Sequence, residues 1–549
     1  MKFGCALLLF LLSSLSAFAQ SWTAKLDKDI RFYQSTEMGV VIAGTEKSLY
    51  AIDGSNGEVL WRRKDTSLDE TDVAPVPGTD LLLLSFEKGD KARIEAVDVL
   101  TGNSIWRSEK IKGDVMHISV DTETNLLAVV LAKDAKNRAR DGFKRRPLLH
   151  VLDLASGDEL WKYEVGEVEM MPARWPDDSG KEVDYTLDNY YPPTFIDGRL
   201  YVFYEGVTSF DARNGKERLR EKYRVNEEGL ALTEAEPIFT ETSVYVSGHG
   251  RVRAISRQTG DTEWEAKDLG LTPEMIVAGD VLYVRTGGQF TRIKDGETIE
   301  RGSYGVSAID VNSGKVLWRY KGADKGITNL LLPDRKVIVI ADRDDLIFLD
   351  TSNGKRTTRV SHKIERPSFG LLNERGDIVI GGQSEIAAFD RSSGRQLWRA
   401  RHTPPGRGIL RTIGAIAARA ASLYFRYGPA VTTAIHFSNL QSLATLATRR
   451  RRSPLRFKRF GVDPSTHLDR LSRFLWHRER LATLRGQWMY FYTNLEGGGS
   501  GLAGVNVNNG GTEREVRLSD LDERFVTDEV LGAMFTASGE RLVSHGLHR

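Results

Sequence analysis

One short unit recurs along most of the chain, and it constrains the fold more than any other feature of the sequence. In each copy an apolar run leads to an Asp, a Gly follows four residues later, and a Trp follows four residues after the Gly. Six copies carry the Trp, and one of these has Ser256 in the Asp position. The repeat residues are Asp53, Gly57, Trp61, Asp98, Gly102, Trp106, Asp153, Gly157, Trp161, Gly260, Trp264, Asp310, Gly314, Trp318, Asp390, Gly394 and Trp398.

Three weaker copies lack the Trp. Two of them keep the Asp and the Gly, and the third has Asn in place of the Asp. They are Asp211 with Gly215, Asp350 with Gly354, and Asn506 with Gly510. The chain therefore contains nine recognisable copies.

The spacing within the unit has a physical cause. An Asp side chain accepts hydrogen bonds from turn N–H groups and a Gly adopts positive φ, so together they join two antiparallel strands. A Trp beyond the turn is large enough to fill a gap between neighbouring sheets. Except for the last pair, successive copies lie 40 to 58 residues apart, which fits four short strands per repeat. Repeats of this length predict an all-β fold, a β-propeller.

The unit resembles the tryptophan-docking repeat of propellers of the pyrroloquinoline-quinone (PQQ) type. That superfamily includes quinoprotein dehydrogenases and the BamB-like scaffold of outer-membrane protein assembly. The resemblance covers residues 22–400 and 487–549. It implies a PQQ-like β-propeller of about eight four-stranded blades, on the BamB-like branch. Because the repeat is structural, it carries over no binding residue and says little about activity.

The two ends of the chain carry signals of their own. Residues 1–19 have a positive start, an apolar core and a small-residue cleavage motif, which together predict a signal peptide and a periplasmic or secreted protein. The single cysteine, Cys5, would leave with that peptide. The segment 21–26 is expected to form an outer strand that closes the ring against a C-terminal hairpin, which would hide a sheet edge.

The repeat is interrupted between the blades predicted for residues 20–400 and a final blade with ring closure in 486–549. The intervening residues 401–485 contain 17 Lys and Arg against 3 Asp and Glu, a local charge of +14 in a chain of net charge +2. Apolar residues at three- and four-residue spacing predict a mainly helical insertion. The candidate docking residues for an anionic partner are Arg449, Arg450, Arg451, Arg452, Arg456, Lys458 and Arg459.

Three interpretations of this insertion remain open at the level of sequence. It packs on the propeller with a solvated basic face; it docks a membrane surface, an acidic polymer or an acidic protein; or it has no settled fold. Nucleic acid is not expected as a partner of an exported protein.

The sequence contains no recognisable catalytic site. PQQ-dependent alcohol dehydrogenases of the superfamily carry a vicinal Cys–Cys disulfide, a calcium or lanthanide ion and a catalytic Asp, and no segment here matches those motifs. We therefore expect no catalytic, cofactor-binding or metal-binding residues. The remaining candidate is a loop epitope with Trp175, Tyr185, Tyr190 and Tyr191. The alternative is that the tyrosines only pack this loop onto the propeller face.

These observations favour an exported, monomeric, non-enzymatic scaffold of the cell envelope that mediates protein–protein interactions, with peripheral contact to a membrane surface as a further expectation. Two alternatives remain. One is a soluble PQQ-dependent dehydrogenase with PQQ and Ca²⁺. The other is a binder of the envelope surface or an acidic polymer that works through the Arg-rich insertion.

Overall fold

The computed structural model describes most of the chain outside its N-terminus and the insertion. The described residues are 21–133, 144–172, 185–187, 190–222, 235–291, 298–324, 328–365, 367, 369–382, 384–403, 487–518, 525–528 and 530–547. The predicted signal peptide and nearly all of the predicted helical insertion, with its Arg cluster, lie outside these residues, so both stay predictions.

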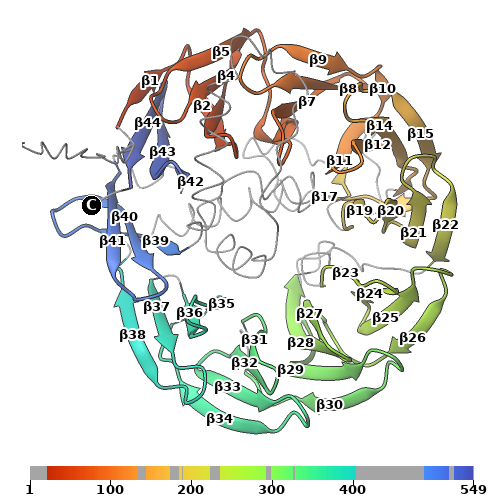
Figure 1. Ribbon diagram of the computed structural model, residues 1–549, viewed down its shortest axis with the longest axis vertical. Helices are drawn as coiled ribbons and strands as arrows, with labels where there is room; N and C mark the ends of the chain where they lie inside the picture. Colours follow the sequence, from red (N-terminus) through yellow and green to blue (C-terminus); the bar gives the residue numbers. More distant parts are fainter. Residues whose placement is uncertain are drawn as a thin grey trace, which may run out of the picture.

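The described strands form a closed ring of small antiparallel sheets, which confirms the predicted β-propeller (Figure 1). Blade 1 contains β2 (Ile30–Ser35), β3 (Val40–Thr45), β4 (Ser48–Asp53) and β5 (Val59–Lys64). Blade 2 contains β6 (Val73–Pro75), β7 (Leu81–Lys88), β8 (Lys91–Asp98), β9 (Ser104–Arg107) and β10 (Ile111–Lys112). Blade 3 contains β11 (Asp114–Asp121), β12 (Leu126–Ala132), β14 (Leu148–Asp153) and β15 (Glu159–Glu164). Blade 4 contains β19 (Thr194–Ile196), β20 (Arg199–Val202), β21 (Gly206–Asp211) and β22 (Glu217–Lys222). Blade 5 contains β23 (Ile238–Phe239), β24 (Ser243–Gly248), β25 (Arg251–Ser256) and β26 (Thr262–Ala266). Blade 6 contains β27 (Glu274–Ala278), β28 (Val281–Thr291), β29 (Thr298–Asp310) and β30 (Val316–Tyr320).

The second half of the ring continues in the same way. Blades 7 and 8 contain β31 (Leu331–Asp334), β32 (Val337–Ala341), β33 (Asp345–Asp350) and β34 (Arg356–Ser361); and β35 (Phe369–Leu372), β36 (Ile378–Gly381), β37 (Glu385–Phe389) and β38 (Gln396–Arg401). Blade 9 contains β39 (Trp488–Asn494), β40 (Ser500–Asn506) and β41 (Thr512–Arg517), and blade 10 contains β42 (Phe525–Asp528), β43 (Ala533–Ser538), β44 (Arg541–Gly546) and β1 (Thr23–Lys25). Smaller elements are the 3₁₀ helix η1 (Glu70–Asp72) and two short sheets, β13 (Lys144–Arg145) with β16 (Val168–Glu169) and β17 (Met171–Pro172) with β18 (Tyr185–Thr186).

The prediction of about eight blades is wrong, because the described residues form ten blade sheets around the ring. The nine copies of the repeat unit account for blades 1 to 9. Blade 10 has no copy, because its third and fourth strands come from opposite ends of the chain and need no turn between them. Residues 487–547 thus supply strands to two blades, whereas the sequence suggested one.

The N-terminal strand closes the ring as predicted. β1 pairs antiparallel with β44, with Thr23 opposite Val543 and Lys25 opposite Arg541. β1 lies at the outer edge of blade 10 (Figure 1), so the first and last described strands share one sheet. This pairing covers the edge of β44 that would otherwise be open to other chains.

The core lies between neighbouring blades. The second strand of a blade is covered on both faces, and every residue of β3 and of β12 is buried. This explains why these strands read as continuous apolar runs instead of alternating ones. At the junction of blades 2 and 3, for example, Leu83 packs in one cluster with Ile118 and Val129.

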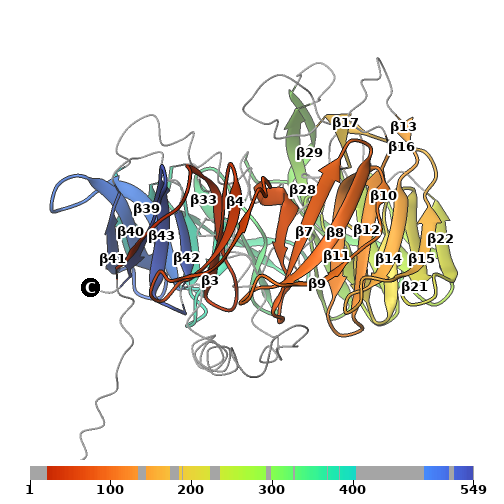
Figure 2. The same cartoon turned by 90° about the horizontal axis from the view of Figure 1, so that it is seen from above.

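The two faces of the ring differ in the connections that they carry. Because the four strands alternate in direction, the Asp–Gly turns between third and fourth strands all lie on one face, here called the turn face. Connections between second and third strands, and between successive blades, lie on the other face. The β28–β29 hairpin projects from this second face, on the same side as β13, β16 and β17 (Figure 2). We call it the hairpin face.

Candidate functional site

The Trp of the repeat lies in the junction between two blades. Trp106 is on the outer strand of blade 2, and its ring covers Gly157 in the turn of blade 3. A Cβ atom added to Gly157 would lie 2.4 Å from Trp106 Cε3, so no larger residue fits beneath the indole. Gly157 also has φ +78°, which disfavours other residues. The Gly and the Trp of the unit therefore serve two different, adjacent blades.

Seven of the ten junctions are built this way, including one formed by Trp22, which lies just before β1. The Gly and Trp pairs are Gly57 with Trp22, Gly102 with Trp61, Gly157 with Trp106, Gly215 with Trp161, Gly314 with Trp264, Gly354 with Trp318, and Gly510 with Trp398. In six of them the indole N–H also donates to the carbonyl that follows the turn Asp of the next blade, at 2.7 to 3.0 Å.

The junction of blades 8 and 9 departs from this pattern. Trp398 covers Gly510, yet its indole N–H has no hydrogen-bond partner among the described residues. The matching acceptor, the carbonyl of Val507, accepts a hydrogen bond from the Asn373 side-chain amide instead, at 3.3 Å. The chain leaves the described ring between these two blades, at the place where the basic insertion begins.

The turn Asp holds its own hairpin together. Asp390 accepts hydrogen bonds from the backbone N–H groups of Ser392 and Ser393 at 3.1 and 2.8 Å, and from both serine hydroxyls. These bonds hold the pKa of the Asp390 carboxyl well below its usual range. Serine hydroxyls and turn N–H groups likewise lower the pKa values of Asp310 and Asp350. The repeat residues thus account for the ring and its turns.

Blade 6 carries the clearest departure from the repeat. β28 and β29 pair with each other from Val281 and Asp310 out to Thr291 and Thr298. The flanking strands stop much earlier: β27 pairs with β28 only as far as Arg285, and β30 pairs with β29 only from Val306. In the described part of the chain, the outer half of this hairpin therefore has no strand on either side.

The base of the hairpin is fixed by close backbone contact with the preceding loop. Leu271 donates its N–H to the carbonyl of Arg301 at 3.2 Å and accepts the N–H of Gly287 at 2.9 Å. A Cβ on Gly302 would lie 2.8 Å from the Cα of Gly270, and both glycines have positive φ. The loop and the hairpin can approach this closely only because neither residue has a side chain.

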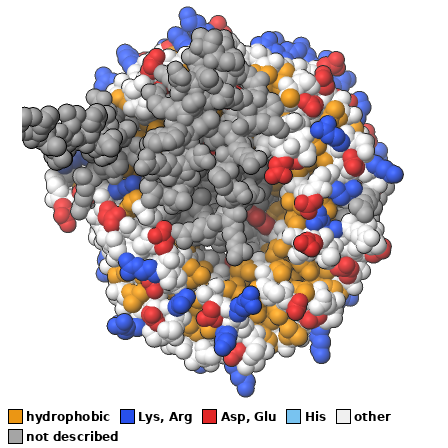
Figure 3. Space-filling model, in the orientation of Figure 1, with side chains coloured by type: hydrophobic (Ala, Val, Ile, Leu, Met, Phe, Trp, Pro, Cys, Tyr) orange, Lys and Arg blue, Asp and Glu red, His pale blue; other side chains and the backbone are white. Residues whose placement is uncertain are grey.

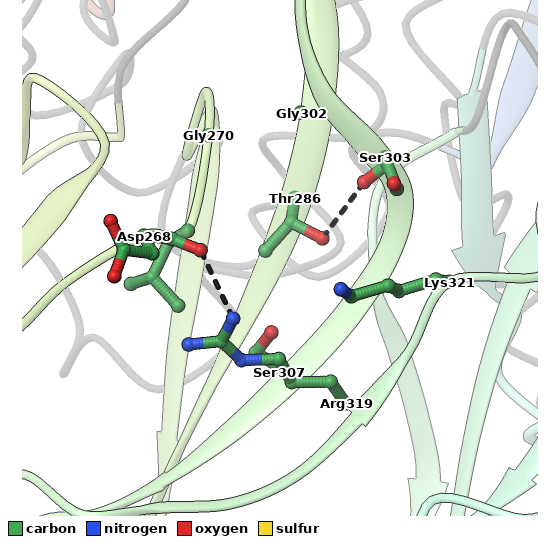
Figure 4. Close-up of a pocket in the computed structure, with 9 residues that line it drawn as sticks. Asp268, Gly270, Thr286, Gly302, Ser303, Ser307, Arg319 and Lys321 are labelled. Carbon is green, nitrogen blue, oxygen red and sulfur yellow. Dashed lines mark hydrogen bonds between the residues drawn. The ribbon is translucent and has the colours of Figure 1, made fainter.

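A small cavity of about 170 Å³ lies beside this contact (Figure 4). Its lining comes from the loop before blade 6 and from three strands of that blade: Asp268, Leu269, Gly270, Thr286, Gly302, Ser303, Ser307, Arg319 and Lys321. The Arg319 guanidinium donates to the carbonyls of Lys267 and Asp268, both at 3.1 Å. In Figure 4 the Lys321 side chain extends toward the space between Thr286 and Arg319. The cavity is polar and opens on the hairpin face.

The predicted loop epitope is only partly described. Trp175 lies outside the described residues. Tyr191 is buried and packs edge-on against Phe203, with ring centroids 6.3 Å apart, so it cannot belong to an exposed epitope. Tyr190 is half-buried against Tyr204, and Tyr185 is half-buried in β18. These tyrosines pack the loop onto blade 4. The β28–β29 hairpin was not predicted from the sequence, where a cluster of glycines is its only signal.

The described residues on one face of the molecule show no dominant charge (Figure 3). Lys and Arg side chains are interspersed with Asp and Glu around the rim of the face seen in Figure 3. Among the described residues, no group of three or more His, Cys, Asp or Glu side chains is placed to hold a metal ion. Within the same residues, no helix has the length and hydropathy of a membrane span.

The chain is similar to several solved structures and to one family of sequences. No curated protein sequence matches the chain. The crystal structure of BamB from Moraxella catarrhalis is 14% identical and covers 68% of this chain and 97% of its own, with a TM-score of 0.35. The computationally designed Ika8 protein is 13% identical, covering 65% and 95%, with a TM-score of 0.32.

A third solved structure, quinohemoprotein alcohol dehydrogenase ADHIIG from Pseudomonas putida HK5, is 12% identical and covers 86% of this chain and 92% of its own, with a TM-score of 0.30. The family assignment does not depend on these structures. The sequence model described as "Outer membrane protein assembly factor BamB" matches residues 17–170, 186–299 and 302–463, well over half of the chain. The protein therefore belongs to the BamB family of PQQ-repeat β-propellers.

Proposed function

We propose that this protein is an exported, non-enzymatic scaffold of the bacterial cell envelope that binds a protein partner on its hairpin face. The family description, an outer membrane protein assembly factor, supports an envelope role in which the propeller holds other proteins. The proposed location is the periplasm, and residues 1–19 are the proposed export signal.

The observation that carries the proposal is the β28–β29 hairpin. Its outer half has no flanking strand in the described part of the chain, and its base is held by the Gly270–Gly302 contact and by two backbone hydrogen bonds. A rigidly based hairpin with open flanks offers main-chain groups to an added strand of a partner. Such an edge is usually avoided in a protein that has no use for it.

The proposal is tested by shortening the hairpin. Gly288 and Arg301 are a register pair, so a two-residue Asn-Gly turn between them replaces residues 289–300 without changing the blade. We expect the variant to keep its melting temperature within a few degrees and to lose the partner that wild-type protein captures from cross-linked envelopes.

A matched control shortens a different connection on the same face. In blade 9, Asn494 and Ser500 are paired, and an Asn-Gly turn replaces residues 495–499. This control should capture the partner normally. Equal capture by the hairpin variant would contradict the proposal, as would dye-linked alcohol oxidation that appears on addition of PQQ and Ca²⁺.

A further inference from the structure

The cavity beside the hairpin contains a cation and a hydroxyl that the fold itself does not use. Lys321 forms no ion pair or hydrogen bond within the described residues, and it lines the cavity. Ser307 is only 3% exposed, and its hydroxyl likewise has no partner in the described part of the chain. A hydroxyl that lines a cavity and has no protein partner is available to a ligand.

The charges around the cavity are arranged for an anion. Figure 4 shows the Asp268 carboxylate pointing away from Arg319 and Lys321, while its backbone carbonyl holds the Arg319 guanidinium. Arg319 lies on β30 and Lys321 directly follows that strand, and both side chains line the cavity. The cavity therefore receives two positive charges and no facing carboxylate from the residues that line it.

The donors at the cavity suit an anion that a protein can offer. Arg319 uses two of its five N–H groups on backbone carbonyls, so it contributes its charge and some remaining donors. The Lys321 ammonium and the hydroxyls of Ser303 and Ser307 also line the cavity. Because the proposed partner is a protein, the anion that it presents to these donors is a carboxylate. A cavity of about 170 Å³ is large enough for a carboxylate and the carbons next to it.

We propose that this cavity binds a carboxylate of the protein partner, with Lys321 and Ser307 as its ligands. The inference rests on the proposed function, because the cavity opens at the root of the hairpin where the partner would lie. The carboxylate comes from the C-terminus of the partner or from an Asp or Glu side chain. Both sources present the same group to the cavity.

The test uses purified full-length protein and dye-labelled peptides, so that it does not depend on capturing the natural partner. Fluorescence anisotropy compares three probes: Gly-Ser-Gly-Val with a free C-terminal carboxylate, the same peptide as an amide, and Gly-Ser-Glu-Gly-Val as an amide. We expect one or both carboxylate probes to bind and the carboxylate-free amide not to bind. Binding of the first probe alone assigns a C-terminus, and binding of the third assigns a side chain.

Two variants separate the cavity from general charge. Lys321→Gln and Ser307→Ala should each weaken binding of the carboxylate probe, Lys321→Gln by roughly tenfold, as expected for loss of a charge-assisted hydrogen bond. Lys315→Gln removes the same charge from the turn face of the same blade and should leave binding unchanged. Equal affinity for all three peptides, no effect of Lys321→Gln, or stronger competition by inorganic phosphate than by acetate would overturn the proposal. Since Lys321 is exposed, its substitution leaves the fold intact, and circular dichroism verifies this.

Discussion

Glycine allows close packing in two regions of this molecule, the blade junctions and the base of the β28–β29 hairpin, and the consequences differ. At the blade junctions, Gly157 and its equivalents lie under the indole of the preceding blade. At the base of the β28–β29 hairpin, Gly270 and Gly302 bring two backbones together. The junction contact recurs seven times and closes a ring. The hairpin contact departs from the repeat, and such departures tend to mark function.

The largest expected effect is at a junction. Trp106→Ala removes a buried indole and its 2.7 Å hydrogen bond to the Leu154 carbonyl. We expect a loss of about 3–5 kcal/mol in the free energy of unfolding, the usual cost of emptying a large aromatic site. Urea denaturation measures it. A loss below about 1 kcal/mol would mean that the junctions do not hold the ring.

The hairpin contact should give a smaller and more local effect. Gly302→Val places a Cβ 2.8 Å from the Gly270 backbone at φ +82°, which should cost about 1–3 kcal/mol. Hydrogen exchange should become faster in 286–291 and 298–305 and stay unchanged in blade 3. Global destabilisation equal to that of Trp106→Ala would erase the distinction between the two regions.

The contribution of the indole hydrogen bond to the free energy of unfolding can be measured by comparing two junctions. Trp106→Phe should lose about 1 kcal/mol beyond the packing difference, because its N–H bond is lost. Trp398→Phe should not lose this contribution, since no described residue accepts the Trp398 N–H. Comparison of the two midpoints in urea checks the difference. Equal losses would show that the hydrogen bond adds nothing to docking.

The smallest effect concerns pH. The pKa values of Asp310, Asp350 and Asp390 are lowered in the folded state, mainly by the serine hydroxyls and turn N–H groups of their turns. A lowered folded pKa gives stability above the unfolded pKa, about 4, and this stability is lost as the pH falls toward the folded value. Asp390→Asn should flatten the stability profile below pH 4. An unchanged acid limb would contradict this role.

The sequence predicted those features that depend on a few neighbouring residues. The Asp390 turn is set within five residues, and the Gly157–Trp106 contact follows from one spacing repeated along the chain. The strand at Thr23 was predicted to close the ring because it preceded any complete repeat. Apart from this closure, features that depend on distant parts of the chain were not predicted.

The predicted number of blades is wrong because blade 10 joins Thr23 to Val543 across the whole chain and contains no turn motif. The cavity was also missed, because Lys321 and Ser307 become neighbours of the Gly270 loop only after blades 5 and 6 pack together. The sequence left open whether Tyr191 belongs to a binding epitope or packs its loop onto the propeller, and the structure packs it against Phe203.

In the proposed function, the ring is a rigid scaffold and its hairpin face binds the partner. Site-specific photo-cross-linking in intact cells tests this most directly, with the cross-linking residue at exposed Ser303 on the hairpin face or at exposed Lys315 on the turn face of the same blade. We predict a discrete cross-linked protein from position 303 and none from position 315. A discrete product from position 315 alone, or from neither position, would contradict the proposed role of the hairpin face.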